Sequence, residues 1–240
     1  MRELMGHNTI TAALFDAVTD YSQPMLTFYH DGTGERTELS AATLGNWAAK
    51  TANYLRDEVG IGPGDDVVID LPEHWQTAAI LLGAWWAGAH VHTASVESAH
   101  IYAAFTTVDD VDRFDADEIV VASLDPFALA IKDLPIGVAD FGSAVRVHGD
   151  QYSPSGFSAG AALDGQSVAQ VLDTAATNAA DSGITADSRV LTTRPWNDAD
   201  DIVEHLVAPL AVGASLVVIA DADPAKVDAK VTAERASIRR

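Results

Sequence analysis

Residues 60–69, GIGPGDDVVI, decide the fold class because they combine a helix stop, a tight turn and an apolar strand. Gly60 suits the position just past a helix C-terminus, and Pro63 prevents the helix from resuming. The helix is predicted over residues 41–59, where apolar side chains recur with helical spacing and Ser40 is a suitable N-cap. The pattern therefore predicts an amphipathic helix that leads directly into a short buried strand.

Beyond this strand, the alternation of helix and strand continues. Pro72 and Glu73 suit the first turn of a second helix, Gly88 ends it, and residues 89–93 are predicted to form the next strand. Strands that alternate with helices are typical of a parallel sheet covered by helices. The expected fold class is therefore α/β, with a largely parallel sheet and helices on both faces.

A second copy of the plan occurs later in the sequence. Residues 183–191, GITADSRVL, again follow a predicted helix and contain a glycine stop, a turn and an apolar strand. Gly60 and Gly183 are 123 residues apart, and Gly88 and Gly213, which precede the next strands, are 125 apart. The sequence thus predicts one domain over residues 1–240, built from two similar halves at approximately 25–148 and 165–240 and joined by a loop at 149–165.

Two local predictions complete the secondary structure. Residues 144–148 are expected to form a strand, because they alternate small apolar and polar side chains. Residues 199–212 are expected to form a helix that bends at Pro209, since proline removes a backbone hydrogen bond inside a helix.

The composition excludes several classes of function. The chain carries a formal net charge of −21 and contains no cysteine, so disulfides and thiolate metal sites are excluded. A strongly negative surface repels phosphate backbones and anionic lipid, and neither nucleic acid nor a membrane is expected as a partner. No apolar run reaches the roughly 18 to 20 residues of a membrane span, and the N-terminus has no signal-peptide pattern. The expected location is the cytoplasm.

Residues 25–95 resemble the opening of the adenylate-forming superfamily, which contains acyl-CoA synthetases, luciferases and peptide-synthetase adenylation domains. The stretches that carry the resemblance are LTF at 26–28, ELS at 38–40, residues 60–72 and AWWAGA at 84–89. Residues 187–219 are similar to the region that follows the phosphate loop of that superfamily. The resemblance implies two related subdomains, in agreement with the internal repeat.

The phosphate loop is where the chain departs from the superfamily. The superfamily holds ATP phosphates with backbone N–H groups, hydroxyls and one lysine, in a loop that ends Pro-Lys-Gly. The corresponding residues 150–160, DQYSPSGFSAG, contain no lysine, and none occurs between Lys132 and Lys226. The adenine- and ribose-binding motifs and the C-terminal domain with its catalytic lysine are also expected to be absent from these 240 residues. ATP and AMP are therefore not expected as cofactors.

Candidate ligand-binding residues follow from the same resemblance. Small residues of the loop and one tryptophan, placed where the superfamily has a wall of its acyl or aryl pocket, form this set: Ser155, Gly156, Ser158, Gly160 and Trp196.

A second pattern in the loop suggests a different chemistry. Residues 156–160, GFSAG, match the G-x-S-x-G nucleophile elbow of serine hydrolases, with Ser158 as nucleophile. His205 would be its base, and Asp187 or Asp200 would orient the base. The residues before the loop are polar and broken by proline, whereas a nucleophile elbow follows directly after an apolar strand.

His90 and His92 are two residues apart on a predicted strand, so they share a face and could bind a metal ion. No carboxylate follows them in sequence before Glu97. We interpret them as packed or surface histidines and predict no metal site.

The predicted function is a catalytically inactive relative of AMP-dependent acyl-CoA synthetases. It would act as a ligand-binding or protein-interaction module, with a small acyl or nucleotide-like ligand, an unidentified protein partner or a second copy of itself. Two enzymatic alternatives stay open: half of an adenylating enzyme completed by a partner chain, and a serine hydrolase that uses Ser158.

Overall fold

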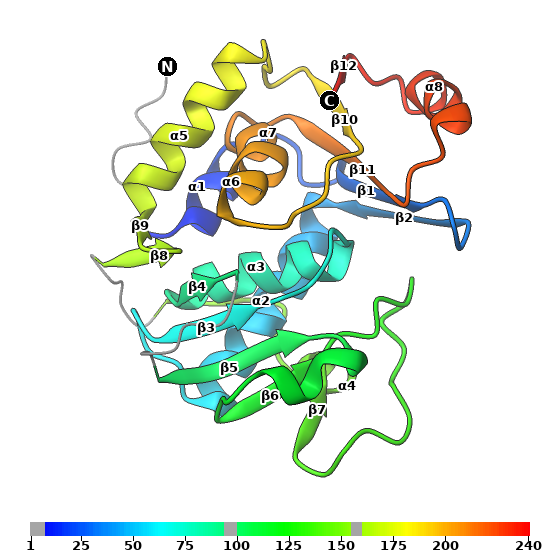
Figure 1. The fold of residues 1–240 in the computed structure, drawn as a ribbon. Helices are drawn as coiled ribbons and strands as arrows, with labels where there is room; N and C mark the ends of the chain where they lie inside the picture. The colour runs from blue at the N-terminus through cyan, green and yellow to red at the C-terminus, as the bar shows by residue number, and fades with distance from the viewer. Residues whose placement is uncertain (1–7, 94–99, 155–159) are drawn as a thin grey trace.

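The protein folds into two β-sheets with helices packed between and around them (Figure 1). The computed structural model describes residues 8–93, 100–154 and 160–240. The fold is mixed α/β, and most neighbouring strands are parallel, as the sequence predicts. In the described part of the chain, no helix is both long enough and apolar enough to cross a membrane.

The larger sheet, called sheet B, has the strand order β7-β6-β5-β3-β4-β8-β9. Only the β8–β9 hairpin is antiparallel. Its strands are β3 (Asp66–Ile69), β4 (His90–His92), β5 (Ile101–Thr106), β6 (Glu118–Val121), β7 (Val138–Asp140), β8 (Ala161–Leu163) and β9 (Gln166–Ser167).

The smaller sheet, called sheet A, has the strand order β12-β10-β11-β1-β2. Only the β1–β2 hairpin is antiparallel. Its strands are β1 (Pro24–His30), β2 (Glu35–Ser40), β10 (Arg189–Thr192), β11 (Ser215–Ala220) and β12 (Ile238–Arg239).

Five strands of sheet B, β5-β3-β4-β8-β9, have the same order and directions as the five strands of sheet A. The central pairs, β3–β4 and β10–β11, are the strands of the two sequence copies. The hairpins are exchanged: β1–β2 precedes the helix of the first copy but completes sheet A, and β8–β9 precedes the helix of the second copy but completes sheet B. Each sheet therefore contains strands from both sides of residues 149–160.

The same turn leads from helix to strand in both copies. The N–H of Ile61 donates to the Leu55 carbonyl at 2.8 Å, and the N–H of Ile184 donates to the Ala179 carbonyl at the same distance. A side-chain oxygen then closes the turn. In the first copy, the Asp65 carboxylate accepts from the N–H of Gly62 at 2.7 Å. In the second copy, the Ser188 hydroxyl accepts from the N–H of Thr185, the equivalent of Gly62, at 3.0 Å. The local hydrogen bonds of the repeat explain why glycine, aspartate or serine recur at these places.

Two helices begin at the caps that the sequence indicates. Ser40 caps α2, and Ser167 caps α5 in a capping box with Gln170. The helical segments are α1 (Ile10–Asp16), α2 (Ala41–Tyr54), η1 (Leu55–Val59), α3 (Trp75–Ala87), η2 (Val108–Arg113), α4 (Phe141–Arg146), α5 (Val168–Asp181), α6 (Ala199–Ile202), η3 (Val203–Val207), α7 (Ala208–Ala211) and α8 (Pro224–Ala233).

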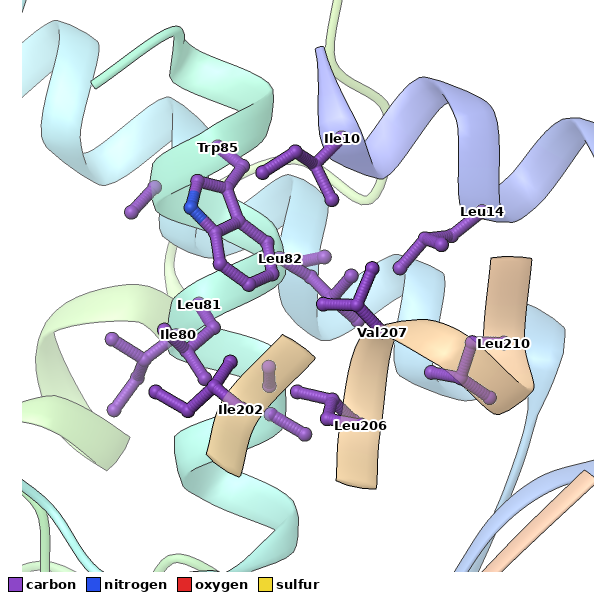
Figure 2. Packing of buried hydrophobic residues seen from close by; sticks show 14 of the residues in the cluster. Ile10, Leu14, Ile80, Leu81, Leu82, Trp85, Ile202, Leu206, Val207 and Leu210 are labelled. Atoms are coloured by element: carbon purple, nitrogen blue, oxygen red, sulfur yellow. The ribbon is translucent and has the colours of Figure 1, made fainter. Parts of the chain in front are cut away.

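The core lies around α3, which is buried on almost every side. Figure 2 shows Leu82 of α3 close to Val207 of η3, and the side chains of α1 packing above them. Gly83 lets α3 approach α2, because a Cβ atom at this position would lie 2.4 Å from the Cβ of Thr51. The helices of the two sequence copies therefore share one apolar core between the sheets.

The outer faces of the two sheets are covered differently. On sheet A, Val227 of α8 packs against Leu191, Val217 and Ile219. On sheet B, the outer cluster contains Val68, Ile101 and Ala104, covered by Phe114 and Ala116 after the short 3₁₀ helix η2. Within the described ranges, no α-helix packs on this cluster of sheet B.

Three local predictions need correction. Residues 144–148 do not form a strand, because Asp140 caps the helix α4 and accepts from the N–H of Ser143. The expected loop at 149–165 contains the strand β8. The helix α3 begins at Trp75 after an N-cap at His74, so Pro72 and Glu73 do not form its first turn. The helix predicted over residues 199–212 is present as α6, η3 and α7; before Pro209, η3 widens into a π-helix, where the N–H of Ala208 donates to the Val203 carbonyl. This wider turn removes the clash that proline makes with a carbonyl four residues earlier.

Candidate functional site

The carboxyl ends of β3, β4 and β10 meet at a cavity of about 180 Å³. We call it the carboxyl-edge pocket; its lining residues are Ile69, Asp70, Leu71, Pro72, Thr93, Trp196 and Asn197. Ligands of open α/β sheets bind beyond the carboxyl ends of the strands, where loops can present side chains. This position makes the pocket the candidate functional site.

A larger cavity of about 330 Å³ lies at the opposite, amino ends of β1, β10 and β11. Its polar lining includes Asp20 and Asp187. We place the functional site in the smaller cavity, because the carboxyl ends of parallel strands are where this architecture builds its sites.

Trp196 is the largest side chain of the pocket and is only 4% exposed. Its indole Nε1–H has no hydrogen-bond partner among the described residues. The backbone holds it in place, because the N–H of Trp196 donates to the Glu73 carboxylate and the N–H of Asn197 donates to Asp201 at 3.1 Å. A buried donor without a partner is costly and is therefore available to a ligand.

The rim of the pocket is acidic. Burial raises the pKa of Glu73 above its ordinary value and Asp201 adds to this, while backbone hydrogen bonds and the charge of His30 oppose it. Asp70 is held by Arg113 at 2.6 Å, so its charge is compensated by a partly exposed ion pair. The field at this edge therefore disfavours a multiply charged anion such as a triphosphate far more than a single carboxyl group.

Lysines are placed away from this edge. Lys50 pairs with Asp150 at 2.6 Å, Lys226 with Asp223 at 3.4 Å and Lys230 with Asp31 at 2.5 Å. Among the residues that the structure describes, no lysine or arginine lines the carboxyl-edge pocket. These lining residues do not fit a nucleotide triphosphate, which needs cations or a row of backbone N–H groups.

The predicted ligand-binding residues divide into three groups. Ser155, Gly156 and Ser158 lie outside the described residues. Gly160 lines a second, much smaller cavity beside Trp85 and Gly88. Trp196 lines the carboxyl-edge pocket, so the described part of the chain does not bring Gly160 and Trp196 into one cavity.

His205, the proposed base of the hydrolase alternative, is buried in η3. Burial lowers its pKa, and the described residues give its Nδ1 no hydrogen-bond partner. Asp187 lines the cavity at the amino ends of the strands, and neither it nor Asp200 orients His205 by a hydrogen bond. The hydrolase alternative stays a prediction, since Ser158 itself is not described.

His90 and His92 have a carboxylate partner that sequence reasoning missed. Asp66 of β3 lies opposite His90 of β4 in the parallel register. Its Oδ1 is 2.8 Å from Nδ1 of His90 and 2.7 Å from Nε2 of His92. The signal was a polar residue at the start of each of two neighbouring strands, Asp66 in β3 and His90 in β4, which becomes informative only once their pairing is known.

Comparisons with known proteins agree with this fold. The AMP-binding enzyme family model matches residues 17–103. The acyl-CoA synthetase of Brucella canis superposes with a TM-score of 0.78 at 17% identity, over 96% of this chain and 46% of that one. An anthranilate CoA ligase in complex with anthranoyl-AMP superposes with a TM-score of 0.77 at 13% identity, over 96% of this chain and 49% of that one. The chain thus spans about half the length of these solved structures, and the likeness shows the fold.

A closer relative is known by sequence. The TIGR03089 family protein of Mycobacterium tuberculosis (strain ATCC 25618 / H37Rv) is 46% identical over 237 residues, which cover 95% of this chain and 96% of the relative. The chain belongs to the TIGR03089 family, and its residues 17–103 carry the AMP-binding enzyme region that its resemblance to the adenylate-forming superfamily predicts.

Proposed function

We propose that this protein binds a small organic acid or acyl group in the carboxyl-edge pocket and does not activate it with ATP. The observation that carries the proposal is the buried, unpartnered indole N–H of Trp196, a residue that lines a pocket without a cation in the described lining. A ligand carbonyl or carboxyl oxygen would accept this hydrogen bond, whose absence is otherwise costly.

The size and lining of the pocket favour a small ligand. A volume of about 180 Å³ is below the roughly 300 to 1,000 Å³ of sites for drug-sized ligands. Ile69, Leu71 and Pro72 supply apolar walls, and Asn197 supplies an amide. The complex of the related ligase with anthranoyl-AMP supports an aryl or acyl group of this size.

The charge distribution supports the absence of catalysis. Transfer of the adenylyl group of ATP to a carboxylate requires donors that stabilise the phosphate charge. The loss of one such donor commonly costs about 100- to 1,000-fold in rate. Asp70 and Glu73 stand at this edge instead, and the described lysines lie elsewhere or in ion pairs. We infer that triphosphate binding is unfavourable here.

Isothermal titration with benzoate, 2-aminobenzoate, short fatty acids, AMP and ATP tests the ligand class. Trp196→Phe keeps an aromatic ring but removes the N–H, and we expect it to weaken acid binding by about tenfold, the value of one hydrogen bond. Trp86→Phe is the matched control, because Trp86 packs on Phe15 and Tyr152 and does not line the pocket.

ATP–pyrophosphate exchange tests the inactivity. We expect no exchange above background with any acid that binds. Exchange that depends on the acid would overturn the non-catalytic part of the proposal, and acid binding that Trp196→Phe leaves unchanged would overturn the placement in the pocket.

A further inference from the structure

We propose that Asp66, His90 and His92 form a binding site for a divalent transition-metal ion such as Zn²⁺, on the outer face of sheet B. The site is independent of the carboxyl-edge pocket and of the function proposed for it.

The strand register brings the three side chains together. β3 and β4 are parallel neighbours, with Asp66 opposite His90 and Val68 opposite His92. Side chains two residues apart share a face of a sheet, so both imidazoles lie on the side of Val68, which belongs to the outer cluster. The strands therefore present the ligands on a rigid part of the fold.

The ligand atoms converge on one point. One nitrogen of each histidine and one carboxylate oxygen of Asp66 all lie within 4.8 Å of one another. The two imidazole rings are in contact, with centroids 4.0 Å apart. Two imidazoles and one carboxylate are a donor set that suits Zn²⁺, and it leaves a further position for water.

A second carboxylate is placed to orient His92. Its Nδ1, the nitrogen that points away from Asp66, is 3.7 Å from Oδ1 of Asp164. Asp164 is fixed by Thr93, whose N–H and hydroxyl donate to it at 3.1 and 2.5 Å. Histidines that bind a metal commonly donate their other N–H to a carboxylate, and Asp164 is positioned for that role.

His90 must change one hydrogen bond when a metal binds. The N–H of Gly165 donates to its Nε2 at 3.0 Å, so the proton of this neutral imidazole is on Nδ1 and is donated to Asp66. A metal ion on Nδ1 shifts this proton to Nε2 and breaks the bond to Gly165. The bond lies at the exposed surface, where water can replace it at a small net cost.

The site is accessible and has the right charge. The side chains of Asp66, His90 and His92 are 26%, 17% and 9% exposed, so an ion can enter without unfolding. Two carboxylates, Asp66 and Asp164, stand beside the two imidazoles and attract a divalent cation. At the equivalent place in sheet A, Arg189 and Ser215 occupy the positions of Asp66 and His90, and no such donor set exists there.

The test uses the untagged full chain after treatment with a chelator. We expect saturable binding of one Zn²⁺ by isothermal titration, with Mg²⁺ much weaker because imidazole ligands do not suit it. Asp66→Asn and His92→Ala should weaken Zn²⁺ binding by more than tenfold, and Asp164→Asn by about 10- to 100-fold. His100→Ala is the matched control: it removes a histidine that is also paired with an aspartate, at 2.9 Å, but has no third ligand among the described residues.

A measurement on the unaltered chain does not depend on the folding of variants. In ¹H–¹⁵N spectra, Zn²⁺ should shift the amide signals of His92, Thr93 and Gly165, and leave those of His100 and Asp117 in place. Absence of one-to-one binding, equal binding of Mg²⁺, or an equal loss in His100→Ala would each overturn the proposal.

Discussion

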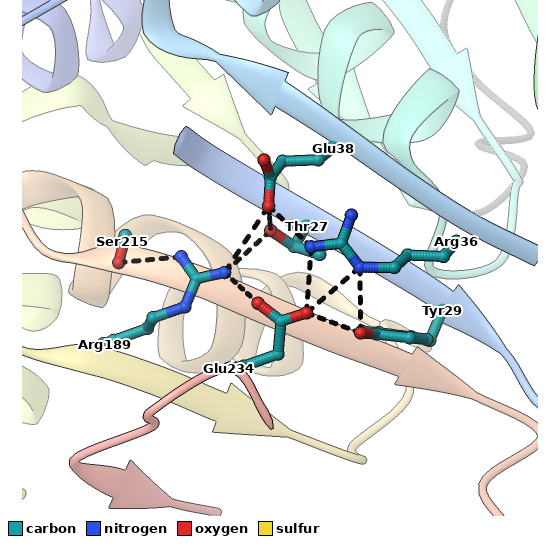
Figure 3. A network of polar contacts seen from close by, with 7 residues as sticks. All are labelled: Thr27, Tyr29, Arg36, Glu38, Arg189, Ser215 and Glu234. Carbon is teal, nitrogen blue, oxygen red and sulfur yellow. Dashed lines mark hydrogen bonds and ion pairs between the residues drawn. The ribbon is translucent and has the colours of Figure 1, made fainter. Parts of the chain in front are cut away.

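The outer faces of the two sheets have equivalent strands but carry different polar clusters. Arg189 starts β10 and Asp66 starts β3, at equivalent places in the two copies, and each lies opposite the first residue of the next strand. In sheet A, α8 packs on this face and its C-cap Glu234 contacts both Arg189 and Arg36 (Figure 3). In sheet B, Asp66 meets two histidines of the neighbouring strand instead.

The difference shows how one architecture supports two kinds of polar cluster. Glu234 is 7% exposed and its surroundings include Tyr29, Thr27 and Glu38, so the network of sheet A has a buried carboxylate at its centre (Figure 3). The cluster of sheet B is smaller, and the described residues place no helix over it. An ion-pair network around a buried carboxylate stabilises the helix end that supplies the carboxylate. A set of two imidazoles and a carboxylate can instead exchange a proton for a metal cation.

Removal of Glu234 should have the largest effect on stability. Glu234→Gln leaves Arg189 and Arg36 without their shared carboxylate. We expect a loss of about 2 to 4 kcal/mol in the free energy of unfolding, somewhat less than the roughly 3 to 5 kcal/mol of a fully buried pair. Arg36 is 45% exposed and Glu38 still contacts it at 2.7 Å, which limits the cost.

Urea denaturation measures this loss. Asp228→Asn is the control, since its pair with Arg239 is exposed on both sides and should contribute at most about 0.5 kcal/mol. Equal losses in the two variants would mean that the network on sheet A is not structural.

Two glycines test the packing of the helices that the copies share. Gly83→Ala places a Cβ 2.4 Å from that of Thr51, and we expect overpacking of about 1 to 3 kcal/mol to exceed the gain in helix propensity. Gly45→Ala is the matched control within α2, because its Cβ would lie 3.4 Å from the Phe15 ring. There we expect stabilisation by about 0.5 to 1 kcal/mol. Thermal unfolding of both variants gives the signs, and a stable Gly83→Ala protein would contradict the close helix contact.

The helix caps give the smallest effect, a dependence of stability on pH. His74 caps α3, whereas Asp198 caps α6 in the second copy. Burial lowers the pKa of His74, although Glu35 opposes this. The unfolded chain therefore binds the proton first, and stability present above the ordinary pKa of about 6.5 is lost as the pH falls towards the folded value.

His74→Asn keeps a cap acceptor and removes this titration. We expect its unfolding free energy to decrease less between pH 7 and pH 5 than that of the unaltered protein. Burial also lowers the pKa values of His90 and His205, so the variant should keep a smaller dependence of its unfolding free energy on pH. An unchanged slope would show that the His74 cap does not titrate in this range.

Much of the local structure could be predicted from the sequence. The stops at Gly60 and Gly183, the caps at Ser40 and Ser167 and the apolar stripes of α2 and α5 all depend on residues close together in the chain. The incorrect predictions also concerned short segments of the chain. Residues 144–148 were interpreted from their alternation, while the cap at Asp140 decided for a helix.

The candidate sites could be predicted only in part. Trp196 was identified from the resemblance, and the structure places it in the carboxyl-edge pocket. Its neighbours there come from two other strands, and no spacing in the sequence indicates them. The sequence interpretation of His90 and His92 considered only carboxylates at later positions. Their partner, Asp66, lies earlier in the chain, on the adjacent strand.

The sequence by itself determined the class of the fold, the repeated helix–turn–strand unit and the negative charge, since hydrophobic period and glycine placement act over a few residues. Only the tertiary structure decided which hairpin completes which sheet, and which side chains share a face across β3 and β4. Parallel strands are joined by long connections, so their pairing depends on the packing of the helices between them. That packing brings together residues whose separation in the chain carries no signal.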